Sequence, residues 1–184
     1  MRELNNWTNI VERWNEVKKM SVKCFSALKP IDDKSDDEPE SILMWSHYAD
    51  GHKGICMVFD TSSYVDNEIG KHILRPVDYD LKILEPNFNS EVSEDEMQRA
   101  VEEAMLRKAK FWDYEKEWRL LVAGEPGNFS YYPIMKLKGI YLGSKISKED
   151  KELIEKIAAD KGIKGTTHET RLDNNCYKIV IRDK

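Results

Sequence analysis

The sequence lacks several features that would assign a protein to a common class. It contains no apolar run of 18 or more residues, and residues 1–6 form no apolar signal region, so we expect neither a membrane span nor secretion. Its only cysteines are Cys24, Cys56 and Cys176, without a C-x-x-C pair. An odd number of unpaired cysteines is typical of reduced thiols rather than of a disulfide framework. We therefore expect a cytoplasmic protein.

Standard catalytic and nucleotide-binding motifs are also missing. No glycine-rich phosphate loop occurs, and Ser26 lacks the G-x-S-x-G context of a nucleophile elbow. The 29 basic and 34 acidic side chains give a net charge of −5, which argues against a broad nucleic-acid surface. A chain of 184 residues can bury one core without a disulfide or a metal. We therefore expect a single domain over residues 1–184.

Hydrophobic periodicity predicts about four helices and six or seven strands. We expect helices at residues 1–20, 42–49, 93–110 and 148–161, with capping signals at Ser93 and Ser147. We expect strands at residues 21–28, 55–59, 73–79, 81–84, 117–122, 138–142 and 176–182. The segment 30–41 predicts an acidic loop. Because helices and strands do not alternate strictly, the pattern predicts an α+β fold with a mixed or mostly antiparallel sheet.

Two strands carry further positional signals. The run Ile55 to Phe59 is continuously apolar, which is typical of a central strand. Pro76 cannot donate a ladder hydrogen bond. It therefore places the strand at residues 73–79 at a sheet edge or a bulge.

The densest polar and aromatic segment runs from Met44 to Gly54. On a helix, its hydroxyl, imidazole and carboxylate side chains converge only near the helix end. One interpretation makes His47 a general base or a ligand hydrogen-bond donor beside the glycine turn. The alternative is that His47 bonds locally and Tyr48 anchors the core.

A structural zinc site is a further alternative for the same region. Its tetrahedral ligands would be Cys24, His47, His52 and Cys56. The spacing contains neither a C-x-x-C nor an H-x-x-x-H pair. The cysteines lie in apolar strand-like segments, where free cysteine behaves as a small hydrophobic residue. We therefore expect no metal.

The segment from Trp112 to Arg119 holds the second group of candidates. On a strand, Glu117 and Arg119 share one face. Arg119 then either pairs with Glu117 or holds a phosphate or carboxylate in bidentate fashion. Glu117 is a candidate catalytic carboxylate with a pKa raised by desolvation. The alternative is a surface ion-pair ladder beside a tryptophan-rich core.

Together, several segments resemble the bacterial domain of unknown function 2971. They are Lys23-Cys24-Phe25-Ser26, the segment from Leu43 to Cys56 with Phe59-Asp60, Trp112 to Arg119, and Gly139-Ile140-Tyr141-Leu142-Gly143. The resemblance covers most of the chain from residue 21 onward. It implies no assigned activity. It also implies an upstream segment with an aromatic-basic opening and a Phe-Asn-Asp-Pro stretch, so we expect this chain to be a truncated or minimal version.

Two functional hypotheses follow. The first is a bacterial or phage nucleotide-handling enzyme of the ADP-ribosyltransferase-like kind, with a small-molecule or nucleotide ligand and NAD as the candidate cofactor. Its pocket would lie between the Ser46–Gly54 turn and the Glu115–Arg119 strand. The catalytic candidates are His47, Tyr48 and Glu117, and the ligand-binding candidates are Ser46, His52, Lys53, Trp112, Glu115 and Arg119.

The second hypothesis is a non-catalytic interaction module with a protein partner, in a phage-defence or stress system. In this interpretation the same residues are structural. Neither hypothesis involves a membrane, and neither relies on nucleic acid as a partner.

Overall fold

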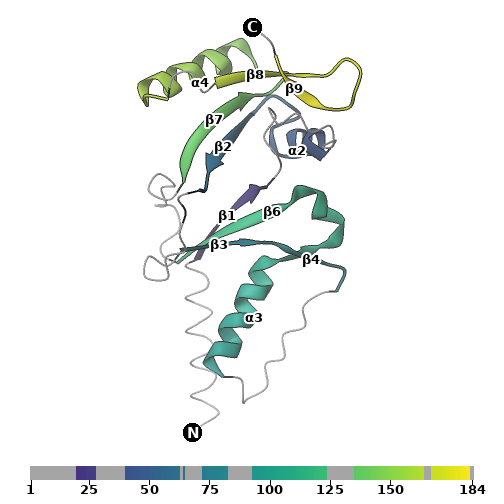
Figure 1. The fold of residues 1–184 in the computed structure, drawn as a ribbon, viewed down its shortest axis with the longest axis vertical. Coiled ribbons are helices and arrows are strands. Elements are labelled where there is room, and N and C mark those ends of the chain that lie inside the picture. The colour runs from purple at the N-terminus through teal and green to yellow at the C-terminus, as the bar shows by residue number, and fades with distance from the viewer. Residues whose placement is uncertain are drawn as a thin grey trace. The chain divides into compact units, whose positions relative to one another are not determined.

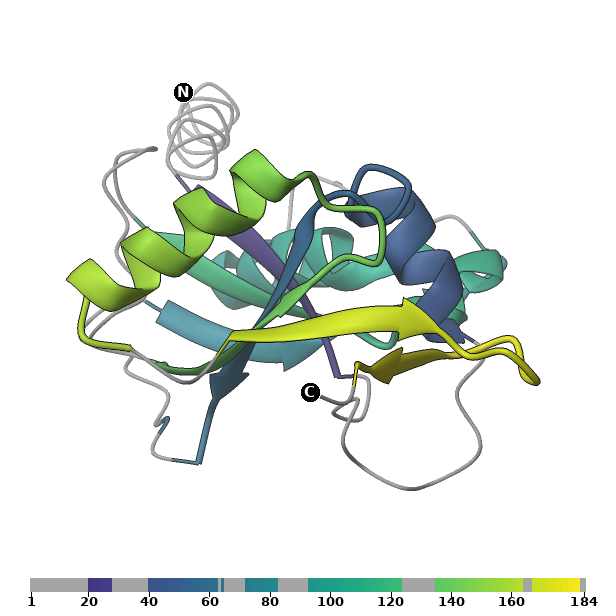
Figure 2. The same ribbon diagram turned by 90° about the horizontal axis from the view of Figure 1, so that it is seen from above.

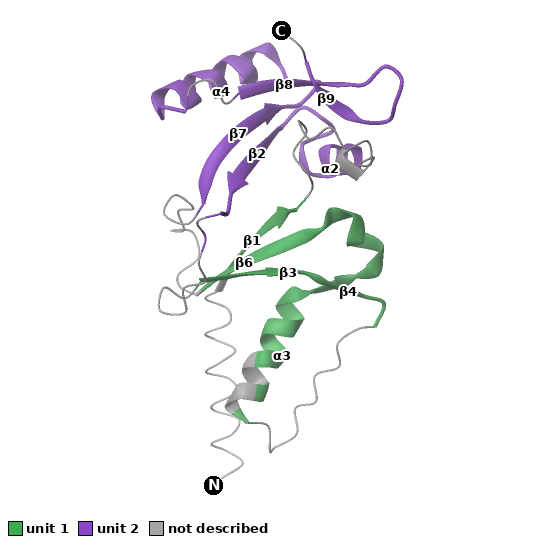
Figure 3. Ribbon diagram, viewed as in Figure 1, with its two compact units in different colours: residues 1–27, 65–129 green, residues 28–64, 130–184 purple. Residues whose placement is uncertain are grey.

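The computed structural model describes residues 20–27, 40–62, 64, 72–82, 93–123, 135–163 and 167–182. The chain divides into two units, which are coloured separately in Figure 3. Unit 1 comprises residues 1–27 and 65–129, and unit 2 comprises residues 28–64 and 130–184.

Unit 1 contains a three-stranded antiparallel sheet in the order β1-β6-β3 and a short parallel pair, β4-β5. Its elements are β1 (Met20–Ser26), β3 (His72–Pro76), β4 (Asp78–Asp80), α3 (Glu94–Leu106), β5 (Arg107–Ala109), the 3-10 helix η1 (Lys110–Glu115) and β6 (Glu117–Ala123). Helix α3 lies on one face of the sheet (Figure 1). It begins with a full capping box, in which Ser93 accepts from the Glu96 N–H and donates its own N–H to the Glu96 carboxylate.

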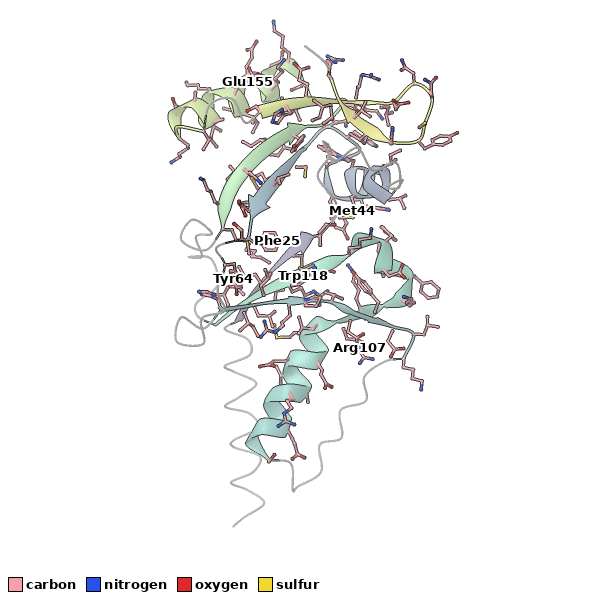
Figure 4. All side chains as sticks on the ribbon, viewed as in Figure 1. Phe25, Met44, Tyr64, Arg107, Trp118 and Glu155 are labelled. Carbon is pink, nitrogen blue, oxygen red and sulfur yellow. The ribbon has the colours of Figure 1, made fainter. Side chains whose placement is uncertain are left out.

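The register of the β1–β6 pair shows which side chains share each face of β6. Phe25 and Trp118 are partners across β1 and β6 and are labelled in Figure 4. Cys24 pairs with Arg119, on the opposite face of the sheet. Leu120 and Leu121, one on each face, are 0% and 1% exposed. The strand is therefore buried on both sides at its centre.

Unit 2 contains a four-stranded mixed sheet in the order β2-β7-β8-β9, in which β7 and β8 are parallel. Its elements are α2 (Glu40–Tyr48), β2 (Ile55–Asp60), β7 (Lys136–Leu142), α4 (Lys148–Asp160), β8 (Thr167–Leu172) and β9 (Ile179–Ile181). Figure 2 shows the β8–β9 hairpin in yellow. Asp173 organises its turn by accepting from the N–H groups of Asn175 and Cys176.

Two small cores lie on the two faces of this sheet. Trp45 and Ala49 of α2 pack with Tyr141 on one side. Ala158 of α4 packs with Ile140 and Leu142 on the other. The helices therefore cover opposite faces of the sheet, as Figure 1 shows. The alternation along β7 explains this, because successive residues point to opposite faces.

The α+β class is confirmed, and the described residues hold nine strands in three sheets, somewhat more strands than expected. The strand β8 was not anticipated. The predicted strand at residues 81–84 is wrong where it is described, because Leu81 and Lys82 form a bend. Helix α3 ends at Leu106 rather than near Lys110, since residues 107–109 pair with β4 instead. β9 is shorter than the predicted 176–182 strand.

Strand β2 is a second correction, because it lies at the edge of its sheet rather than at the centre. Its residues Cys56 and Met57 are exposed, although the run is apolar. The edge position predicted from Pro76 is confirmed, because β3 is an outer strand of its sheet.

Some expectations lie outside the described residues. These are the amphipathic helix at residues 1–20, except for Met20 in β1, and the acidic loop at residues 30–41, except for the start of α2 at Glu40. The single-domain organisation stays a prediction. Among the described residues, no helix has the length and apolar character needed to span a membrane.

Candidate functional site

A group of four buried or half-buried charged side chains lies at the start of β6 in unit 1. We call Lys108, Glu115, Glu117 and Arg119 the charge cluster. The Lys108 ammonium lies 2.8 Å from Glu117 Oε2 and also donates to Glu115 Oε2. Arg119 donates from Nε to Glu117 Oε1 at 2.8 Å. Each oxygen of Glu117 therefore faces a cation.

The two carboxylates of the cluster are buried. Glu115 is 3% exposed and Glu117 is 5% exposed. Arg119 also donates from its guanidinium to the carbonyl of Met105, at the end of α3. A buried charge is tolerated only where it is paired and hydrogen-bonded. The pairing explains how two carboxylates remain inside this unit.

The cluster residues lie on β5, η1 and β6, and contacts from β4 and β1 hold them in place. The parallel pairing of β4 with β5 places Tyr79 opposite Lys108. The Tyr79 hydroxyl accepts the Glu117 backbone N–H at 2.8 Å. From β1, the Ser26 hydroxyl donates to the Glu115 carbonyl at 2.6 Å. Hydrogen bonds from β4 and from β1 thus hold the backbone at Glu117 and at Glu115.

The protonation of the cluster follows from these contacts. Burial alone would raise the pKa of Glu117, but hydrogen bonds from Arg119, Cys24 and Lys108 outweigh burial and hold the pKa at about 2. The expected raised pKa of Glu117 is therefore wrong, because its neighbours favour the charged form. Burial opposes the charge of Lys108, yet its glutamate partners hold the Lys108 pKa well above the ordinary value. Glu117 is ionised throughout the physiological pH range.

An aromatic group adjoins the cluster on η1. The Lys108 ammonium lies 5.4 Å from the centre of the Trp112 ring, which is a cation–π distance. The rings of Trp112 and Tyr114 are 6.0 Å apart. Trp112 is 39% exposed and Phe111 is 79% exposed. The 3-10 helix therefore presents aromatic surface next to buried charge.

The second candidate region is the turn that follows α2 in unit 2. We call residues 49–54 the His52 turn. Asp50, Gly51 and His52 all have positive φ, at 45°, 59° and 75°. The carbonyl of His52 accepts from Lys145 N–H at 3.0 Å, and the carbonyl of Gly54 accepts from Gly143 N–H at 2.9 Å. The turn is therefore held against the loop after β7.

The side chain of His52 is buried, at 7% exposed, and only one of its nitrogens has a partner among the described residues. Nε2 lies 3.1 Å from Ser46 Oγ, and the Ser46 hydroxyl donates to the Ile42 carbonyl at 2.8 Å. The single hydrogen of the Ser46 hydroxyl is already donated to the Ile42 carbonyl, so the hydroxyl oxygen accepts from the imidazole. We therefore assign the imidazole proton to Nε2 of His52. Burial, followed by the nearby charge of Lys145, lowers the pKa of His52.

The remaining candidates of this region lie at the surface. Ser46, His47 and Lys53 are exposed. Tyr48 is 61% exposed, so it does not anchor the core. Trp45 and Ala49 fill that position instead. The hydrogen-bonded partner of Ser46 is thus His52 and not the adjacent His47.

The structure brings Glu115, Glu117 and Arg119 together in unit 1, with Trp112 beside Lys108, and it joins Ser46 to His52 in unit 2. The two groups belong to different units, so the pocket expected between them stays a prediction. Among the described residues, no set of three or more His, Cys, Asp or Glu side chains is placed to hold a metal ion.

Sequence reasoning missed Lys108 and Tyr79. Lys108 fell inside the helix predicted for residues 93–110, and only the three-residue β4–β5 pairing turns it toward the carboxylates. Strands of three residues leave almost no periodic signal. The capping box at Ser93 fixed where α3 begins but not where it ends.

The chain is similar to a protein family of unknown function. A family model described as protein of unknown function (DUF2971) matches residues 44–120, which is less than half of the chain. That range begins within α2 and ends within β6, so it includes both candidate regions. No curated protein and no solved structure matches the chain. The resemblance to this family of unknown function is therefore confirmed over residues 44–120.

Proposed function

We propose that the chain is a nucleotide-handling enzyme of the ADP-ribosyltransferase-like kind, acting on NAD, with Glu117 as its central carboxylate. One observation carries the proposal. Glu117 is buried but held ionised, with a pKa of about 2, between Lys108 and Arg119. Buried, strongly perturbed carboxylates are concentrated at functional sites.

The low pKa decides which role Glu117 takes. A carboxylate that ionises near pH 2 is a poor general base at neutral pH. It serves instead as a fixed negative charge and hydrogen-bond acceptor. Cleavage of the bond between nicotinamide and C1′ of the ribose develops positive charge on the ribose, and nicotinamide leaves with the bonding electron pair. In the hydrolytic reaction a water molecule then bonds to C1′ and releases its proton to solvent. A nearby ionised carboxylate stabilises that charge and orients the ribose hydroxyls.

The other predicted residues receive supporting roles in this proposal. Arg119 acts through Glu117, because its guanidinium is bonded to that carboxylate and to the Met105 carbonyl. Trp112 offers a half-exposed indole for stacking. His47 and Tyr48 lie at the exposed C-terminal end of α2, where they are accessible to a ligand.

The test is release of nicotinamide from NAD by the full chain, followed by chromatography. We expect Glu117→Gln to reduce the rate at least about 10²-fold, because it removes the charge and keeps the shape. The matched control is Glu169→Gln in unit 2, which also removes a carboxylate from an ion-pair network. Absence of nicotinamide release by the unmodified chain overturns the proposal, as does full activity of a folded Glu117→Gln chain.

A non-catalytic interaction module is the second candidate, and the burial of Glu117 favours it. At 5% exposed, with a cation at each oxygen, the carboxylate has little surface for a ligand. The exposed aromatic residues of η1 would then contact a protein partner. A phage-challenge or stress assay decides between the two, because a folded Glu117→Gln chain keeps its phenotype only if Glu117 is structural.

A further inference from the structure

The His52 turn extends the antiparallel pairing of β2 with β7 beyond the ends of both strands. The Gly143 N–H donates to the Gly54 carbonyl at 2.9 Å. The Lys145 N–H donates to the His52 carbonyl at 3.0 Å. The turn is also bonded to α2, because the His52 N–H donates to the Trp45 carbonyl at 3.2 Å. His52 is therefore the residue at which the helix and the end of this ladder are joined.

The backbone of the turn is strained. Asp50, Gly51 and His52 all have positive φ, which is unfavourable for the two of them that carry a side chain. Residues persist in this region only where the surrounding structure holds them there. The ladder bonds do so here, together with the burial of the His52 side chain. A change that makes burial of this side chain unfavourable therefore acts against the whole turn.

The imidazole of His52 is buried with one nitrogen left to accept a proton. In the tautomer assigned above, Nε2 already carries the proton that it donates to Ser46. Nδ1 is buried and has no hydrogen-bond partner among the described residues. A second proton therefore binds at Nδ1, where no acceptor faces it. Because a buried charge without a partner is far more costly than a neutral ring, the protonated side chain is stabilised by moving into water.

The charged groups near the turn do not compensate an imidazolium at this position. Lys145 lies across the ladder from His52, and its positive charge opposes a second one. Within the turn, Asp50 pairs with Lys53 at 3.8 Å, and both side chains are exposed. From α2, the last turn contributes His47, which is also exposed. None of these four residues is recorded in an ion pair with His52.

We propose that His52 is a pH-sensitive latch of unit 2: the neutral imidazole holds the His52 turn against the loop after β7, and protonation at Nδ1 releases the turn together with the C-terminal end of α2. That end of the helix carries the exposed side chains of His47 and Tyr48. The inference goes beyond the proposed function and does not depend on it, because all of its residues lie in unit 2 and it requires no ligand.

The test follows the two ladder amides directly. Amide hydrogen exchange of the full ¹⁵N-labelled chain, measured by NMR at pH 7, 6 and 5, reports local opening at Gly143 and Lys145. The rates are expressed as protection factors, which correct for the pH dependence of exchange itself. We expect both protection factors to fall about 10-fold from pH 7 to pH 5, because the released imidazole binds a proton with its ordinary pKa of 6.5. The amide of Lys161, bonded to the Ile157 carbonyl at the end of α4, is the internal reference and should not change.

Two histidine variants form a matched pair. Asparagine tolerates positive φ and does not titrate. In His52→Asn, the protection factors of Gly143 and Lys145 should therefore be the same at pH 7 and at pH 5. His47→Asn removes an exposed histidine from the adjoining helix and should keep the full decrease. The reverse result, with the pH dependence lost in His47→Asn and kept in His52→Asn, overturns the inference.

The unmodified chain supplies a second measurement, which decides the matter even if His52→Asn does not fold. The Cε1–H resonance of His52 reports the titration of its ring, and we expect that titration to coincide with the fall in protection at Gly143 and Lys145. Constant protection factors between pH 7 and pH 5 overturn the inference, because the ring then gains its proton without releasing the backbone or gains none. An equal fall at Lys161 overturns it as well, because acid then acts on the whole unit. Neither measurement uses NAD, so its result is independent of the proposed function.

Discussion

The charge cluster of unit 1 and the His52 turn of unit 2 bury titratable side chains to a similar extent with opposite results. Glu117 and His52 are 5% and 7% exposed. Glu117 has a cation at each oxygen and keeps its charge. His52 has one neutral partner, Ser46, and its second ring nitrogen has none among the described residues.

The difference shows that partners, more than burial, decide the protonation of these groups. Burial works against the charged form in both regions. In unit 1, ion pairs exceed that effect, so the pKa of Glu117 falls to about 2. In unit 2, the positive charge of Lys145 also disfavours the protonated imidazole and so adds to the effect of burial. The charge cluster keeps Glu117 ionised, whereas the His52 turn favours a neutral imidazole.

The largest expected effect comes from breaking the ion pairs of unit 1. Arg119→Met removes the guanidinium bonds to Glu117 and to the Met105 carbonyl. Removal of one partner from a buried pair leaves an uncompensated charge and costs about 3–5 kcal/mol. Urea unfolding followed by tryptophan fluorescence measures the loss. As a control, Lys148→Met breaks an exposed pair with Glu152 and should change little. Equal losses in the two variants would contradict the comparison.

A smaller effect should follow from forcing the His52 turn apart. A Cβ at Gly143 would lie 2.1 Å from the His52 carbonyl oxygen, which is backbone and cannot rotate away. Gly143→Ala should therefore cost about 3 kcal/mol. Gly162→Ala is the control, because an added Cβ meets open space there. Its only cost is the backbone strain of a φ of +73°, about 1–2 kcal/mol. If Gly162→Ala proves the more destabilising change, the packing of the turn does not hold it.

The sequence allowed much of the secondary structure to be predicted, because its signals are local. The capping serines at Ser93 and Ser147 begin α3 and α4 as expected. Apolar residues likewise marked β2, but they did not show that β2 lies at a sheet edge. Strand order depends on which segments pair across the chain, and that information is not local.

The candidate site was predicted in part for the same reason. The pairing of Glu117 with Arg119 follows from their two-residue spacing on one strand face. The contribution of Lys108 depends on a three-residue parallel pairing, and that of Tyr79 on a hydrogen bond spanning 38 residues. The protonation of Glu117 could not be predicted without these partners, so burial alone suggested the wrong direction.

The smallest expected effect tests the comparison through pH. The pKa of folded His52 lies below its ordinary 6.5, so its contribution to stability is present above pH 6.5 and is lost as the pH falls below it. For Glu117, the contribution is present above pH 4.5 and is lost as the pH falls toward 2. His52→Asn, which tolerates positive φ, should remove only the contribution that is lost below pH 6.5. Urea unfolding at pH 7, 6 and 5 measures it. Asn does not titrate, so His52→Asn should change how the free energy of unfolding depends on pH between pH 7 and pH 5. If that dependence equals that of the unmodified chain, His52 finds a partner for its proton, and the contrast between the two regions disappears.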